Sequence, residues 1–346
     1  MAKSIKLTSG SIMCGNPITF GIEPETIDGT PSFHRIKAEI ECGISGGNYE
    51  TITMDRPVQT EGRAVQIDVS SALRSLRDTY SYTPDALTAP MVKFNVKVYD
   101  EYMTDGELHT SAPIYYPEPN VHLCALFGAF TDMERIRSGG SKDVQALSRK
   151  PTDAPHLAYV GEEVVHAVPY EQPQSLISSQ DLARPVSEVA AVKAEGLQTV
   201  GTHSVYAVPQ QQNAPRTVFR FINSFGMIES VSVPCVYSSE TSTESTVYAT
   251  TCEETFNVLP QSAVSRGSDA ETWKFSTDPL TRNWAQWYLH EFLRTRRAWM
   301  LVDGMYLPVV ITVDDDKTTL FDRTKTDMYR FEFTAQLDVS GVLSAV

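Results

Sequence analysis

The sequence predicts a mainly β protein, in which tandem β-sandwich modules of the immunoglobulin or fibronectin kind precede a β-sheet domain packed by one long α-helix. Short runs of alternating apolar and polar residues recur along the chain between Gly, Pro, Asp and Ser, as half-buried strands do. Apolar residues at helical spacing occur in one short segment and one long one. The length of 346 residues exceeds one typical core and favours two or three domains.

The first module is expected over residues 1–118. Its clearest strand is 92–99, where four apolar residues alternate with Lys93, Asn95 and Lys97, so one face is expected in the core and the other in water. The segment 68–80 predicts a short helix behind a Ser cap. Several strands with one short helix are typical of an immunoglobulin-like sandwich. The remaining strands are expected at 17–22, 35–42 and 64–69.

A middle β module is expected over residues 119–214, between two linkers. The first linker, 113–119, is rich in prolines, which cannot supply the backbone donors of a central strand. The second, 210–215, is polar and ends in Pro. Strands are expected between the linkers at 156–168, 186–194 and 198–208.

The third module, residues 215–346, combines strands with the long helix, expected at 279–298. Asp278 and Pro279 form an N-cap and N1 pair at its start. A sheet packed by one amphipathic helix is the simplest arrangement for these elements. Strands are expected at 217–222, 229–237, 246–250 and 271–275, and 308–313 is expected to pair with 329–337 beyond a turn at 303–304.

The long helix carries the residues most suited to contacts between subunits. Its apolar set spans more of the circumference than one sheet contact covers, so we expect Trp287 to face a partner. The basic run 294–297 closes the helix, where cations complement the helix dipole; a salt bridge between subunits is the alternative interpretation. The candidate assembly interface therefore comprises Trp284, Trp287, Tyr288, Arg294, Arg296 and Arg297.

Charge and hydropathy disfavour two classes of partner. The net charge of −14 opposes binding to a phosphate backbone, so no sequence-specific nucleic-acid partner is expected. No segment approaches the ~20 apolar residues of a membrane span. The first ten residues contain no apolar core or cleavage site of a signal peptide, so the chain is expected to stay in the cytoplasm in which it is made.

Motifs of catalysis and metal binding are absent, so no catalytic, cofactor-binding or metal-binding residues are predicted. The sequence has no G-x-S-x-G and no P-loop, and its histidines lack the spacing of a zinc site. The acidic run 314–316 is more typical of a solvated hairpin end than of a calcium site. The five scattered cysteines predict free thiols, with a bridge between Cys235 and Cys252 as the less favoured alternative.

Short motifs in all three modules give the chain a family resemblance. In order along the chain they are Asn16–Phe20, Ile67–Ser70, Leu147–Pro151, Arg220–Gly226, Phe275–Leu280 and Pro308–Ile311. Taken in this order, they resemble virion structural proteins of tailed bacteriophages and related prophages. The resemblance implies a non-enzymatic tail or baseplate subunit of the virion, assembled in rings with copies of itself and with other tail proteins, and without cofactors.

Two other functions stay open at this point. A receptor-binding or carbohydrate-binding adhesin would also be built of β-sandwiches, and 15 Tyr and 4 Trp could stack on sugars. A particle-associated glycan hydrolase needs only two suitably spaced carboxylates, which 43 acidic residues could supply in any fold. The absence of a convergent catalytic motif makes the hydrolase the weaker alternative.

Overall fold

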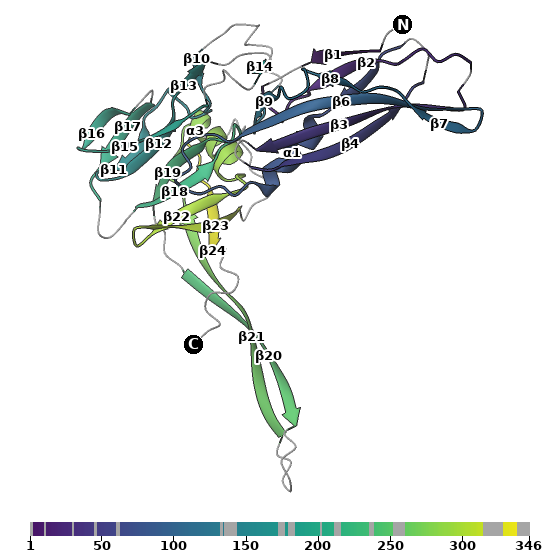
Figure 1. The fold of residues 1–346 in the computed structure, drawn as a ribbon. Coiled ribbons are helices and arrows are strands. Elements are labelled where there is room, and N and C mark those ends of the chain that lie inside the picture. Colours follow the sequence, from purple (N-terminus) through teal and green to yellow (C-terminus); the bar gives the residue numbers. More distant parts are fainter. Residues whose placement is uncertain are drawn as a thin grey trace. The chain divides into compact units, whose positions relative to one another are not determined.

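The fold is given by a computed structural model and is mainly β, which confirms the predicted class at this level (Figure 1). In 144–146, 170–171, 177–178, 239–251 and 260–271 the backbone alone is described. The described residues are 3–9, 12–29, 31–44, 47–59, 63–131, 134, 144–171, 177–178, 184–200, 203–210, 216–234, 239–251, 260–313 and 328–337.

The chain divides into two compact units, each assembled from separate stretches of sequence. Unit 1 comprises residues 1–148, 167–188 and 224–228, and unit 2 comprises the remainder. The three consecutive modules expected from the sequence stay a prediction, because a unit defined by contacts need not coincide with one that folds alone. The expected linker 210–215 lies almost wholly outside the described residues.

Unit 1 contains two main sheets. Phe20 of the smaller sheet is fully buried, and its ring lies 5.3 Å from that of Tyr116 in the larger sheet, so the two sheets pack on each other. The smaller sheet has the order β1 (Ser4–Ser9), β2 (Thr19–Glu23), β5 (Val65–Asp68). The larger has the order β14 (Ile177–Ser178), β9 (Leu123–Leu126), β6 (Met91–Thr104), β3 (Phe33–Ile44), β4 (Tyr49–Pro57), with β7 (Glu107–Thr110) and β8 (Ile114–Tyr116) also on β6. A separate pair joins β10 (Val144–Ala146) to β13 (Pro169–Glu171).

The short helix α1 (Ser70–Thr79) follows β5, as predicted, and buries Ala72, Leu73 and Leu76. The predicted Ser cap is wrong. The carboxylate of Asp68 instead accepts hydrogen bonds from the backbone N–H groups of Ser70, at 2.9 Å, and Ile18, at 3.1 Å. This residue therefore holds the start of the helix and the entry to β2 together.

Strand β6 is more buried than its alternation predicts. Asn95, expected in water, is 5% exposed and donates a hydrogen bond to Glu41 at 2.9 Å. Asp100 is fully buried, and its carboxylate lies 3.0 Å from the ammonium of Lys3 and 2.9 Å from the ring of His34. A buried carboxylate needs such partners. Asp100 lies on the same face of β6 as Val96 and Val98, opposite Asn95, so burial of both faces of the strand required compensating polar groups.

The segment 113–119 is not a linker between separate sheets. Residues 114–116 form β8, which pairs with β6 from Val98↔Ile114 to Val96↔Tyr116. Strand β9, beyond the prolines, pairs with the same β6. The prolines are tolerated because they lie at the ends of a short strand.

Unit 2 is built around a seven-stranded sheet. Its order is β19 (Ile228–Pro234), β18 (Arg216–Ile222), β22 (Ala298–Val302), β23 (Met305–Val313), β24 (Glu332–Leu337), β21 (Pro260–Ser276), β20 (Ser239–Thr251). The predicted pairing of 308–313 with 329–337 is confirmed in β23 and β24, and the turn at Asp303 and Gly304 has the expected positive φ angles. A smaller sheet joins β11 (His156–Tyr159), β17 (His203–Val208) and β16 (Gly196–Val200). The predicted strand 156–168 is interrupted at Gly161 and continues as β12 (Glu163–Ala167); β15 (Ser187–Ala191) covers most of the expected 186–194.

The helix expected at 279–298 is shorter than predicted. It consists of α3 (Arg282–Trp287) and one π-helical turn, η1 (Tyr288–Phe292). At its start, the backbone of Leu280 is engaged by Tyr329 in two hydrogen bonds of 2.8 and 2.9 Å. At its end, the carbonyl of Arg297 accepts a hydrogen bond from Ile222 of β18. Backbone groups committed to strands cannot continue a helix, so the sheet limits its length.

Candidate functional site

The three aromatic residues of the predicted interface lie in the core of unit 2. Trp284, Trp287 and Tyr288 are 5%, 3% and 4% exposed and belong to one apolar cluster with the sheet. The ring of Trp287 packs on Phe221 of β18 at 5.6 Å. The expectation that Trp287 faces a partner is therefore wrong: the sheet, the preceding strands and the π turn surround the whole apolar set.

The three arginines of the predicted interface lie just beyond the helix and are exposed. Arg294 follows the π turn, and Arg296 and Arg297 lead into β22. Because the helix ends at Phe292, these cations are not in its last turn as expected. The structure separates them from the buried aromatic residues, so the predicted set does not form one surface.

A second segment of unit 2, which contains Arg149, Lys150 and Ala154, also contacts the helix. The indole N–H of Trp284 donates to the carbonyl of Ala154 at 3.2 Å, and Arg149 forms an ion pair with Glu291 at 2.8 Å. The ammonium of Lys150 lies 5.5 Å from the centre of the Trp287 ring, a cation–π distance. The helix is thus contacted both by the sheet and by this segment, and both contribute to the burial of its tryptophans.

An ionisable cluster is enclosed beside this helix. Lys150 is 5% exposed and donates to the carbonyl of Ser230 at 3.2 Å. Glu162, Glu229, His156 and His203 are also buried, each at most 5% exposed. The ring nitrogens of His156 and His203 have no hydrogen-bond partner within the described residues. Groups of this kind are seldom buried without strong effects on their protonation.

Burial sets the protonation of the cluster. It lowers the pKa of Lys150 to about 8, against the opposing effect of Glu229 and Glu162, and raises the pKa of Glu162 to about 7. Burial, followed by the charge of Lys150, lowers the pKa of His203 to about 4 and that of His156 well below its ordinary value. Both imidazoles are therefore neutral at pH 7.

Within the described residues, this cluster does not have the geometry of an active site. Its members are closed off from solvent, so a substrate has no access to Lys150 or the histidines in this conformation. No group of three or more His, Cys, Asp or Glu residues in the described ranges is placed to hold a metal ion. Cys14, Cys42 and Cys124 are buried free thiols; Cys235, Cys252 and the acidic run 314–316 lie outside the described residues. Within that same part of the chain, no helix is long and apolar enough to cross a membrane.

The β-ribbon formed by β20 and β21 is the feature of unit 2 best suited to contact another molecule. The two strands pair from Ser239↔Trp273 to Thr251↔Pro260, whereas β24 pairs with β21 only over Thr272–Ser276. Residues 260–271 therefore have β20 as their only strand neighbour in the described chain, and the ribbon extends away from the sheet (Figure 1). At ~3.3 Å per residue, the projecting part is roughly 35 Å long.

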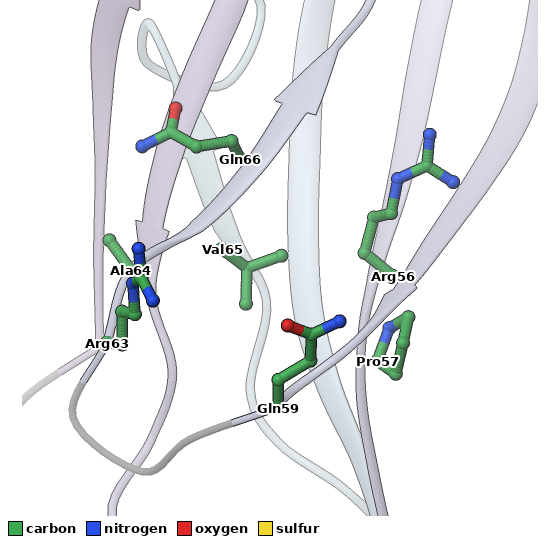
Figure 2. A pocket seen from close by; sticks show the side chains of 7 residues that line it. All are labelled: Arg56, Pro57, Gln59, Arg63, Ala64, Val65 and Gln66. Atoms are coloured by element: carbon green, nitrogen blue, oxygen red, sulfur yellow. The ribbon is translucent and has the colours of Figure 1, made fainter.

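A second exposed feature is an arginine-lined hollow in unit 1, with a volume of about 300 Å³. It lies where the end of β4 approaches the start of β5. Figure 2 shows that its polar side chains come from both strands and from the residues next to them. The lining comprises Arg56, Pro57, Gln59, Arg63, Ala64, Val65 and Gln66.

Neither feature was predicted from the sequence. Strands were expected at 246–250 and 271–275, but the continuous ribbon between and beyond them was missed because its Ser-, Thr- and Glu-rich sequence lacks clear alternation. Arg56 and Arg63 belong to separate segments that only the tertiary fold brings together. The length of the Ser/Thr-rich stretch 239–251 was the one available signal for the ribbon.

The burial of Trp287 predicts that Trp287→Ala unfolds unit 2. Loss of the indole leaves a cavity between Phe221 and Lys150, and removal of a buried tryptophan costs about 3–5 kcal/mol. Thermal denaturation followed by near-ultraviolet circular dichroism measures the effect. Arg294→Ala, at an exposed position of the same unit, is the control and should leave the transition unchanged. A folded Trp287→Ala variant that only fails to assemble would restore the original interface assignment.

The lowered pKa of His203 predicts a loss of stability in acid. As pH falls below the ordinary value of 6.5, the unfolded chain takes up a proton that the folded chain refuses until about pH 4. The free energy of unfolding then falls by up to ~1.4 kcal/mol per pH unit from this residue. Glu162, with its raised pKa, acts in the opposite direction over part of this range, so the effect is measured as a difference between variants.

His203→Leu should therefore flatten the decline of unfolding free energy between pH 6.5 and 4.5, measured by urea denaturation. Leu197→Ala, at an exposed position of the same unit without an ionisable side chain, supplies the control and should keep the wild-type slope. Equal slopes in wild type and His203→Leu would show that the imidazole takes up its proton equally well in the folded and unfolded chain, and would contradict this prediction.

Comparison with known proteins gives no relatives: no family model, no curated protein and no solved structure matches the chain. What the chain does is therefore inferred from its own residues.

Proposed function

We propose that the chain is a non-enzymatic structural subunit of a tailed-phage tail or baseplate, which forms rings with copies of itself and contacts other tail proteins. The observation that carries this proposal is the β20–β21 ribbon. An isolated two-stranded ribbon is marginally stable in water, and its edges present unpaired backbone groups. A ribbon projecting roughly 35 Å is explained by a neighbouring molecule that completes it.

The finer fold assignment belongs to the same proposal. Unit 1, with its two packed sheets and short helix, is consistent with an immunoglobulin-like sandwich. Sandwich modules of this kind expose edge strands, and repeated heterologous contacts between such surfaces generate rings when the rotation closes. The motif resemblance supports the same function, and we propose with it a location in the virion after assembly in the host cytoplasm.

The burial of the tryptophans bears on the carbohydrate-binding alternative. Trp284, Trp287 and Trp299 are each at most 6% exposed, so they offer no aromatic platform on which a sugar could stack. Trp273 is partly buried on the same core. These positions favour the structural proposal over the adhesin.

Shortening the ribbon should abolish assembly without unfolding the subunit. We would replace residues 244–268 by Asn-Gly, a two-residue hairpin turn, which keeps the pairs from Ser239↔Trp273 to Thr243↔Asp269. Wild type should sediment as a ring-sized oligomer at micromolar concentration and the variant as a monomer, because the completing contacts are gone. Tryptophan fluorescence, which comes from four residues that all lie in unit 2, and circular dichroism verify that this unit stays folded.

Two results would contradict the proposal. A variant that assembles as wild type does would exclude the ribbon as the assembly element. A wild-type chain that is monomeric in solution and makes no repeated contacts in its native particle would exclude the ring-forming function itself.

A further inference from the structure

The arginine-lined hollow lies at an open side of unit 1. Among the described strands, β4 is the last strand of the larger sheet and is bonded only to β3, while β5 is the last strand of the smaller sheet and is bonded only to β2. Both strands therefore have a free edge where the hollow is located. Free edges of nine and four residues are sites at which a further strand can be added.

The two arginines at this open side form no ion pair among the described residues, although Arg56 donates a hydrogen bond to the backbone carbonyl of Asp55 at 3.4 Å. Arg56 and Arg63 are exposed, and no carboxylate in the described part of the chain forms an ion pair with either. Arg35 on the neighbouring strand shows the contrast, because its guanidinium binds Asp55 at 2.9 Å and Glu101 at 2.6 Å. In a chain of net charge −14, two exposed arginines that have no carboxylate partner among the described residues, and that lie beside strand edges, favour an acidic partner at this place.

The ribbon of unit 2 has the complementary composition. Its strands over 239–251 and 260–271 contain four acidic residues and one basic residue, Arg266. The acidic residues lie in the half nearer the sheet, where Thr243 pairs with Asp269 and Thr241 with Glu271. Strand β20 is itself the last strand of its sheet, so no other described strand pairs with its outer edge. The four acidic residues are Glu240, Glu244, Asp269 and Glu271.

We infer that the arginine-lined hollow of one subunit receives the acidic half of the β20–β21 ribbon of a second copy. Strand-edge contact with β4 or β5 supplies backbone hydrogen bonds, and the two guanidinium groups select the acidic ribbon and set its register. The contact is heterologous, since ribbon and hollow are different surfaces, and repetition of it produces a ring or a filament. This inference rests on the proposed assembly function and names the receiving surface for it.

Charge reversal on each side tests the pairing. Arg56→Glu with Arg63→Glu should weaken association between copies by at least about tenfold, because like charges would then meet at the hollow. Glu244→Arg with Asp269→Arg should have the same effect from the ribbon side. Sedimentation velocity at 50 mM and 300 mM salt measures the association, and the difference between wild type and either variant should shrink at the higher salt.

Mixing the two variants provides the decisive comparison. Each variant alone should stay monomeric, whereas the mixture should assemble, because the reversed ribbon fits the reversed hollow and the two unaltered surfaces fit each other. Lys6→Glu with Arg74→Glu makes the same change in net charge at exposed positions of unit 1 and should leave assembly intact. Melting temperatures of all variants, within a few degrees of wild type, would exclude unfolding as the cause.

The outcomes separate this inference from the proposed function. Normal assembly of the Arg56→Glu, Arg63→Glu variant would overturn the inference and leave ring formation standing. Loss of assembly in both variants without recovery in the mixture would also overturn it and would assign the hollow to a different acidic partner. Absence of assembly by wild type under all conditions, and of repeated contacts in the particle, would remove the proposed function together with the inference.

Discussion

The packing of Phe292 on the seven-stranded sheet is the interaction on which unit 2 depends. Its ring is fully buried and lies 5.4 Å from Phe219, 5.3 Å from Phe221 and 5.5 Å from Phe333, so one side chain joins β18 to β24. The π turn carries Phe292 together with Tyr288 into this position. Because the aromatic residues of the helix are used for internal packing, the helix has no apolar surface left for a partner.

With the helix used for internal packing, the assembly that we propose depends on strand edges and on the ribbon. A sheet whose core is completed by its own helix can still pair through its last strand, and here the last strand belongs to the projecting ribbon. Contacts of this kind depend on backbone hydrogen bonds and charge, so they can be specific without a large apolar surface. The buried ionisable cluster around Lys150 belongs to the interior of unit 2 and offers no surface to a partner. Because burial lowers the pKa of His203, the cluster reduces the free energy of unfolding in acid.

The strands and the helix that could be predicted from the sequence are those in which one face is buried and the other is more exposed. Strands β3, β6, β18 and β23 and helix α1 were found at the expected places because their apolar residues face a core at strand or helix spacing. The helix of unit 2 was predicted too long, since nothing local reveals that Leu280 and Arg297 give their backbone groups to strands. The interface residue Trp287 was misassigned for a related reason: the layer that covers it comes from a distant segment containing Lys150. Arg56 and Arg63 likewise line the same hollow only because the tertiary fold brings their two segments together.

Electron cryomicroscopy of the assembled particle, at a resolution that traces the chain, tests the central claim most directly. Adjacent copies of the chain should form a closed ring, with the β20–β21 ribbon of each copy lying along the β4 and β5 edges of its neighbour beside Arg56 and Arg63. A particle in which the ribbon projects into solvent, or in which neighbouring copies meet only through other surfaces, would contradict it.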